Sequence, residues 1–517
     1  MRNRWMCLVF FLFCLIVSGL AEASDPRHPP LEKTPAAVDK DLSRLTLQDC
    51  LDIAFAGSRL RLISAESVKI AEAQYGQALS GHWPQVKFSM TGVRMDEDPT
   101  FLFPSQPLNL GAAGRPFAEA IANAQLAKMG ITPDSVGLAA YNNALAAATA
   151  EAMRGLSMAS MPAYNVKLMD RDLLTSTLSL IYPLYTGGKV SALTRQAKAG
   201  VDASKEEARR TDLQIIRDIK QYYYGYVFSK ALHRLGRQTL ERFAATESLT
   251  QEVYRHGSGR VKKTDYLRSK MMTAAVCSAV EMMKSNEELT RSALANTMGL
   301  PWNIPVDVAE TDIPFSPFGR ELDELVASAQ THNPQMNQVR LGLGAADAKI
   351  SEARSGHLPV VAIFGNLTRL DNSYSGGLIT DENRNSWQVG VSLELPIFNG
   401  FRTSKEVQEA RLRHEKLRQE SLLLSEGVAL QVKNAFLQIA RSQAQVQSGR
   451  EALETAAENA DLHIRAYAQG MVETREIIES QLMEFIMHGQ YLKALYDHQV
   501  NQAHLDYLIG KSIHENH

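Results

Sequence analysis

The chain has 517 residues, of which 45% are hydrophobic and 22% charged, and its formal net charge is −2. This near-neutral balance leaves no basic surface for a nucleic-acid partner, which the composition therefore excludes. The sequence carries no phosphate-binding glycine loop, no metal-ligand spacing and no nucleophile motif, so we expect no enzyme, no cofactor and no metal site.

An export signal is predicted for residues 1–23. Arg2 and Arg4 give it a positive start, an apolar core runs from Met6 to Val17, and Ala21-Glu22-Ala23 forms a small-residue cleavage site. Beyond it, no apolar run reaches the ~18 residues that a membrane helix needs. We therefore expect an exported protein in which any membrane-spanning part is built from β-strands.

The remainder of the chain contains one unit twice. Ser80-Gly81-His82-Trp83-Pro84 returns as Ser355-Gly356-His357-Leu358-Pro359, 275 residues later. Further along, the offset between matching motifs falls to 213 and then to 211, where Asp265 corresponds to Glu476. Drifting offsets are typical of one unit that was copied and then edited by insertions.

The repeat predicts the domain organisation. We expect a first half at residues 45–300 and a second half at 321–511, joined by a proline-rich connector at 301–320. A periplasmic lead at 24–44 precedes the halves, and a tail at 512–517 follows them.

Very long helices are predicted in both halves. Proline is absent from Leu184 to Leu300 and from Ile397 to the C-terminus, and both stretches are rich in helix-forming residues. The segment from Gly188 to Gly257 alone would form a rod of roughly 100 Å at 1.5 Å per residue. A return helix from Val261 to Met298 and a helix from Leu60 to Ser80 would lie end to end beside it. Coiled-coil seams are predicted from a repeated heptad spacing at Ile215, Ile219, Tyr222 and Tyr226 and at Val428, Val432, Ala435 and Ile439.

Four strands of about ten residues are predicted from alternating apolar and polar positions, two in each half. They lie at Val86–Arg94, Leu174–Tyr182, Val360–Thr368 and Trp387–Leu395. One apolar face per strand is what a lipid-facing barrel requires. Because four strands cannot close a barrel, we expect several copies of the chain to combine. The alternative is a secreted coiled-coil structural or adhesin protein without a pore, which would have no need of such strands.

The first strand hairpin is longer than the second. Its loop spans 99 residues from Pro84 to Pro183, against 37 from Pro359 to Pro396, an excess of 62. The excess falls in an Ala-, Met- and Gly-rich stretch at about 100–161, and the sequence assigns no role to it.

These features together resemble TolC-type outer-membrane efflux proteins. The resemblance covers essentially residues 45–511 and depends on the duplicated helix-strand-strand-helix-helix halves, on Pro183 to Gly187 and Pro396 to Gly400 at the strand-helix junctions, and on Tyr467-Ala468-Gln469-Gly470. It implies a fold that is mainly α with a β-barrel contribution: four barrel strands per chain, and a homotrimer with a 12-stranded barrel and a long helical tunnel.

The resemblance also implies a function. Such proteins lie in the outer membrane of Gram-negative bacteria, in contact with its lipid and with a large periplasmic portion. They are passive conduits of tripartite efflux or type I secretion systems, and they join a periplasmic adaptor (membrane fusion) protein and an inner-membrane pump or ABC exporter. Which partners and which transported substrate apply here cannot be predicted from the sequence.

By the same resemblance, the periplasmic entrance lies at the helical turn after Gly470. Glu476 and Glu479 would form an acidic ring there, Asp265 takes the matching position of the first half, and Tyr467 matches the residue that keeps the entrance shut. From the charges alone we also expect salt bridges between neighbouring tips, with Arg260, Lys262 and Lys263 as cations and Glu473 among the anions. Two readings stay open for Gly257, Gly259 and Gly470: adaptor contact, or chain reversal alone.

Overall fold

The computed structural model describes residues 42–107, 111–158, 160–257, 260–374, 376–380 and 382–511. The predicted signal peptide, nearly all of the predicted lead, the tail and Gly259 lie outside these residues. The chain divides into two compact units. Among the described residues, a helical unit comprises 42–78, 192–350 and 406–511, and a strand unit comprises 79–191 and 351–405.

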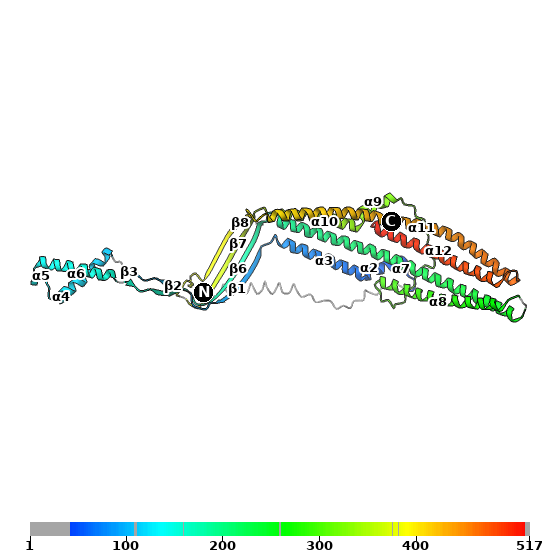
Figure 1. Ribbon diagram of the computed structural model, residues 1–517, viewed down its shortest axis with the longest axis horizontal. Coiled ribbons are helices and arrows are strands. Elements are labelled where there is room, and N and C mark those ends of the chain that lie inside the picture. The colour runs from blue at the N-terminus through cyan, green and yellow to red at the C-terminus, as the bar shows by residue number, and fades with distance from the viewer. Residues whose placement is uncertain are drawn as a thin grey trace. The chain divides into compact units, whose positions relative to one another are not determined.

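Long helices in matched pairs make up the helical unit (Figure 1). The helices are α2 (Leu47–Gly57), α3 (Arg59–Ser80), α7 (Lys189–Arg255), α8 (Lys263–Thr297), α9 (Leu322–His332), α10 (Pro334–Ser355), α11 (Arg402–Gln469) and α12 (Thr474–Leu508). The two long helices, α7 and α11, have 67 and 68 residues, and both return helices have 35. The predicted long helices of both halves are thus confirmed. Within the described part of the chain, no helix has the length and apolar character needed to cross a membrane.

The buried seam of α7 differs from the prediction at one position. Ile215, Ile219 and Tyr226 are buried, but Tyr222 is 36% exposed, and Tyr223 is buried in its place. The Tyr223 hydroxyl donates to the backbone oxygen of Leu45, so a segment near the start of the described chain covers this face of the helix. In α11 all four predicted seam residues are buried. The prediction for Tyr222 was wrong because Leu45 and α2 pack on the neighbouring Tyr223 instead.

A four-stranded antiparallel sheet forms the centre of the strand unit. Its strands are β1 (Gln85–Arg94), β6 (Asp172–Tyr185), β7 (Val360–Asn372) and β8 (Asn385–Glu394), in the order β1-β6-β7-β8 (Figure 1). The four predicted strands are confirmed, and the two halves of the repeat meet where β6 pairs with β7. Strands β1 and β8 are the edges of this sheet within one chain.

The extra stretch between β1 and β6 folds as a helical hairpin on a two-stranded stalk. The stalk pairs β2 (Thr100–Phe103) with β5 (Tyr164–Lys167), and β3 (Gln106–Pro107) with β4 (Ser160–Met161). Beyond it come the 3-10 turn η2 (Gly111–Gly114) and the helices α4 (Arg115–Lys128), α5 (Pro133–Val136) and α6 (Leu138–Met158). The extra stretch of the first half is therefore mainly helical and rich in alanine.

Candidate functional site

The long helices form two hairpins, α7 with α8 and α11 with α12, and we call the turn of each hairpin its tip. Each tip reverses the chain at a glycine with a positive φ. Gly257 after α7 has φ 65°, and Gly470 after α11 has φ 78°. At Gly470 two backbone bonds close the helix end: Met471 N to Ala466 O at 2.9 Å and Gly470 N to Tyr467 O at 3.0 Å. This pair of bonds is the Schellman motif, in which a left-handed residue satisfies the last helical carbonyls. Chain reversal thus accounts for both glycines.

Gly470 also allows a contact between the two tips. A Cβ atom added to Gly470 would overlap the guanidinium group of Arg260, which belongs to the turn between α7 and α8. Among the residues that the structure describes, none beyond its chain neighbours lies within 4 Å of a Cβ atom added to Gly257. The first tip therefore rests on the second through the predicted tip cation Arg260, in contact with backbone rather than with a carboxylate.

The acidic residues at matching positions cap the two return helices. The Asp265 carboxylate accepts a hydrogen bond from Lys262 N at 2.9 Å, and the Glu476 carboxylate accepts one from Glu473 N at 3.0 Å. Each acid lies in the first turn of its helix, where it also meets the positive end of the helix dipole. Asp265 and Glu476 thus have a structural task in addition to any role in an entrance.

Some of the charged side chains at the tips form ion pairs within their own helices. Glu479 lies 2.9 Å from Arg475, and Asp265 lies 4.0 Å from Arg268. Exposed pairs of this kind contribute about 0–1 kcal/mol. Among the described residues of the two tips, no ion pair within one chain joins Arg260, Lys262 or Lys263 to Glu473, Glu476 or Glu479. Salt bridges between tips of neighbouring copies stay a prediction.

Tyr467 belongs to a buried chain of hydroxyl groups that joins the two hairpins. Its Oη lies 2.9 Å from Thr250 Oγ1 on α7 and 3.0 Å from Thr474 Oγ1 on α12. Since the Thr250 hydroxyl donates to Thr246 O, the Tyr467 hydroxyl donates to Thr250 and accepts from Thr474. All three hydroxyl groups are buried and satisfied. The latch residue predicted by resemblance thus connects α7, α11 and α12 within one chain.

Two further contacts between the hairpins were not predicted from the sequence. Thr246 and Gln481, both buried, are hydrogen bonded with Nε2 and Oγ1 3.3 Å apart. Arg242 on α7 donates to Glu484 on α12 at 2.6 Å. Their spacing in the sequence gives no signal, because each pair brings together helices that are more than 200 residues apart. Only the packing of α7 on α12 shows them.

The predicted junction residues lie where strands of the strand unit lead into helices. Pro183 is close to a register shift in the pairing of β6 with β7. A Cβ atom on Gly187 would lie 2.8 Å from Leu358 Cβ and 2.9 Å from Ser355 O, so the repeated Ser-Gly-His-x-Pro segment packs directly on this glycine. Pro396 and Gly400 lie between the end of β8 and the start of α11.

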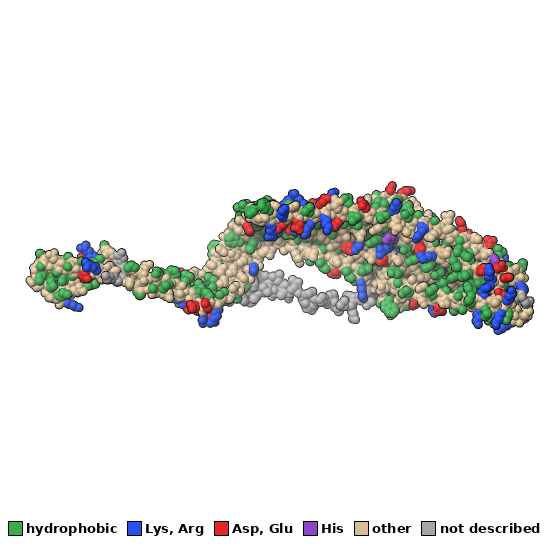
Figure 2. Space-filling model, viewed as in Figure 1, with side chains coloured by type: hydrophobic (Ala, Val, Ile, Leu, Met, Phe, Trp, Pro, Cys, Tyr) green, Lys and Arg blue, Asp and Glu red, His purple; other side chains and the backbone are tan. Residues whose placement is uncertain are grey.

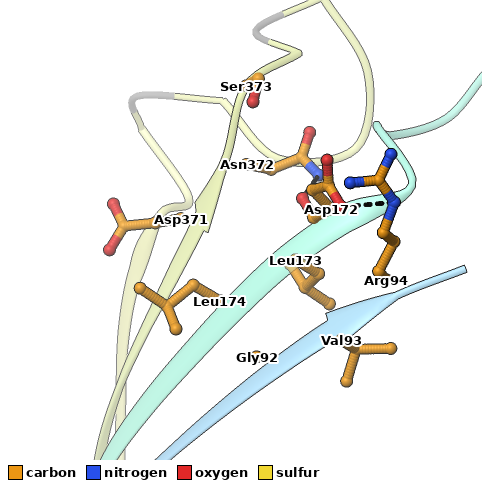
Figure 3. A pocket seen from close by; sticks show the side chains of 9 residues that line it. All are labelled: Gly92, Val93, Arg94, Asp172, Leu173, Leu174, Asp371, Asn372 and Ser373. Atoms are coloured by element: carbon orange, nitrogen blue, oxygen red, sulfur yellow. Dashed lines mark hydrogen bonds and ion pairs between the residues drawn. The ribbon is translucent and has the colours of Figure 1, made fainter.

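At the opposite end of the sheet, β1, β6 and β7 line an open hollow of about 530 Å³. Arg94 and Asp172 are register partners on β1 and β6, and their side chains lie next to each other in its lining (Figure 3), where they form an ion pair of 3.7 Å. The Asn372 amide donates to the backbone oxygens of Asp170 and Asp172, which fixes the end of β7 to the start of β6. The described residues contain no group of three or more His, Cys, Asp or Glu side chains placed to hold a metal ion. The hollow lies at the strand ends where the chain leaves the sheet for the extra stretch.

Helices of nearly 70 residues in both halves, together with a four-stranded sheet that has two open edges, are the features expected of an outer-membrane channel protein. The sequence model of the family described as "Outer membrane efflux protein" matches residues 147–267 and 325–511, together more than half of the chain. The chain belongs to this family.

Curated relatives and solved structures agree with this assignment. The chain is 22% identical to the outer membrane protein TolC of Salmonella enteritidis, over 65% of this chain and 69% of that protein. It is also 22% identical to the alkaline protease secretion protein AprF of Pseudomonas aeruginosa, over 66% and 70% of the two chains. Among solved structures it resembles the outer membrane protein VceC of Vibrio cholerae, with a TM-score of 0.66 at 14% identity over 90% of this chain and 96% of that one. The outer-membrane channel OprN gives the same TM-score and identity over 94% and 98%.

The chain is therefore an outer-membrane channel component of an efflux or secretion system, with a large helical portion in the periplasm. This result confirms the resemblance, the mainly helical fold with a barrel contribution and the location predicted from the sequence. The alternative of a secreted structural protein or adhesin without a pore is set aside. The relatives are channel and secretion proteins rather than enzymes.

Proposed function

We propose that three copies of this chain form a passive conduit that joins a periplasmic adaptor protein and an inner-membrane pump or ABC exporter to the cell exterior. Each copy contributes the halves at 45–300 and 321–511, linked by the connector at 301–320. The partner supplies the energy, and the conduit supplies a water-filled path.

The observation that carries this proposal is the division of the sheet into an apolar and a polar face. Phe88, Leu178, Leu367 and Trp387 stand opposite one another across all four strands. The next row, on the other face, is Lys87, Ser179, Asn366 and Gln388. Such a sheet has one side suited to lipid and one suited to water.

Assembly follows from the same sheet. Strands β1 and β8 are its edges, and unpaired backbone groups cost several kcal/mol each in a membrane. Pairing β1 of one copy with β8 of the next satisfies both edges. Three copies then close a barrel of twelve strands, in which the apolar rows contact lipid.

We further propose that the tips form the periplasmic entrance. Glu476 and Glu479 of the three copies would form an acidic ring that favours cations. The hydroxyl chain through Tyr467 would hold the second hairpin against the first, which keeps the entrance closed. Opening would require α11 and α12 to move away from α7, with loss of the Tyr467–Thr250 and Thr246–Gln481 contacts. Adaptor contact at Gly257 and Gly470 would add to their role in chain reversal.

The proposal is tested with the full-length mature protein purified in detergent. We expect a trimeric mass from light scattering and discrete, cation-preferring channels in planar bilayers. Replacing both acids by glutamine, Glu476→Gln with Glu479→Gln, is expected to lower the cation preference, because glutamine keeps the cap of α12 and removes the charge. A monomeric protein without conductance would refute the conduit, and an unchanged ion preference would refute the acidic ring.

A further inference from the structure

We propose that the helical hairpin of the extra stretch, α4 with α6, packs against the same hairpin of the two other copies and forms a six-helix assembly outside the membrane. The inference depends on the proposed trimer. It concerns a part of the chain that lies largely outside the family match, which begins only at residue 147.

The hairpin has a small internal core. Ala118, Ala122 and Leu126 of α4 are buried, and they follow the i, i+4, i+8 spacing of the face that packs on α6. The Tyr141 hydroxyl of α6 donates to Asn123 Oδ1 of α4 at 2.9 Å. Small alanine side chains let the two helices approach closely, but they bury little apolar area.

A second face of α4 is apolar and exposed. Phe117 is 68% exposed and Ile121 42%, and both share one helix face with Ala124. At the far end of the hairpin, Met129 and Leu138 are also exposed. Figure 2 shows hydrophobic side chains over most of this part of the molecule. Extended apolar patches of this kind mark sites of association.

The charges of the hairpin favour another copy of the same surface as the occupant. Arg115 lies 3.2 Å from Glu119, and Arg154 lies 3.1 Å from Glu151, so both arginines are balanced within their own helices. A surface that binds anionic lipid headgroups would instead present a cationic face. A surface whose charges are balanced and that carries an exposed apolar stripe can pack against the same apolar stripe of another copy.

The connection to the sheet brings the copies together. The hairpin leaves from the end of β1 and returns to the start of β6. The stalk continues the antiparallel pairing from Thr100↔Lys167 to Pro107↔Ser160. In a closed barrel, three such stalks emerge at one rim, and tethering raises the effective concentration of the hairpins to the millimolar range, about 1 mM or more. Weak apolar association then suffices for a stable assembly.

The test is cysteine cross-linking in the full-length trimer. The exposed native thiol is removed by Cys277→Ser, while Cys50 is buried and stays. Ile121→Cys places a thiol on the apolar face, and Glu119→Cys places one on the opposite flank of the same helix as the matched control. With a short bis-maleimide, we expect at least fivefold more cross-linked dimer from Ile121→Cys than from Glu119→Cys.

The oligomeric state separates the two proposals. Equal cross-linking of both variants in an intact trimer would overturn the hairpin assembly and leave the conduit standing. A monomer in light scattering would overturn both. A fluorophore on Ile121→Cys whose emission shifts to the blue only when vesicles of phospholipid and lipopolysaccharide are added would assign the face to the membrane surface, and would also overturn the hairpin assembly.

Discussion

The two helical tips have the same backbone conformation but carry different charges. Both end in a glycine with a positive φ, and in both an acid in the first turn, Asp265 or Glu476, caps the return helix. At the same offset of 211, Lys262 corresponds to Glu473 and Arg268 to Glu479. The copy thus kept the carboxylate that caps the helix, whereas the charge changed sign at these two other positions. Arg268 and Glu479 form only weak ion pairs within their own helices, so we expect any function of the tips in binding or gating at the positions whose charge changed sign.

The largest stability effect is expected at the turn glycines. Ala in the left-handed region costs about 1–2 kcal/mol, so Gly257→Ala and Gly470→Ala should both lower the melting temperature of the protein. Gly470→Ala must also displace Arg260, and we expect it to be the more damaging of the two. Combining it with Arg260→Ala should bring it level with Gly257→Ala. If Gly470→Ala melts at the wild-type temperature, the assigned turn is wrong.

The caps should behave alike in both halves. Asp265→Ala and Glu476→Ala each remove a carboxylate from a helix N-terminus, which costs about 0.3–1 kcal/mol. Asp265→Asn and Glu476→Gln keep an acceptor and should recover part of the loss. Thermal unfolding followed by circular dichroism measures all four variants. A large effect of one alanine variant and none of the other would end the structural equivalence of the two tips.

A smaller effect is expected at the ion pair between the hairpins. Arg242 is about half exposed and Glu484 mostly buried, so the pair should contribute about 0–1 kcal/mol. The stability difference between Glu484→Gln and wild type should shrink as salt rises from 0.05 to 1 M, about the range over which screening becomes strong. Arg475→Gln is the control, because it breaks an ion pair within α12 and leaves the contact between the two hairpins intact. A salt-independent difference at Glu484 would show that packing, not charge, holds the hairpins there.

Most of the architecture was predictable because it repeats along the sequence. Long stretches without proline predicted α7 and α11, and period-two alternation predicted the strands. The cap role of Asp265 and Glu476 was hidden, because the residues at the N-cap are Lys262 and Glu473 rather than the usual Ser or Thr. Thr250 and Gln481 were out of reach, because their roles arise only when α7 packs against the second hairpin.

The central claim is that buried contacts at Tyr467 hold the two hairpins together and keep the entrance closed. Its most direct test compares the single-channel conductance of Tyr467→Phe with that of Tyr266→Phe. Tyr266 is the control, because its hydroxyl accepts from Gln251 within the first hairpin only.

Losing the Tyr467 hydroxyl should cost about 1 kcal/mol per chain, or about 3 kcal/mol in a trimer, which is roughly a hundredfold in the ratio of closed to open channels. The account predicts a clear rise in conductance for Tyr467→Phe and none for Tyr266→Phe. Wild-type conductance for Tyr467→Phe, in a trimer that still conducts, would contradict it.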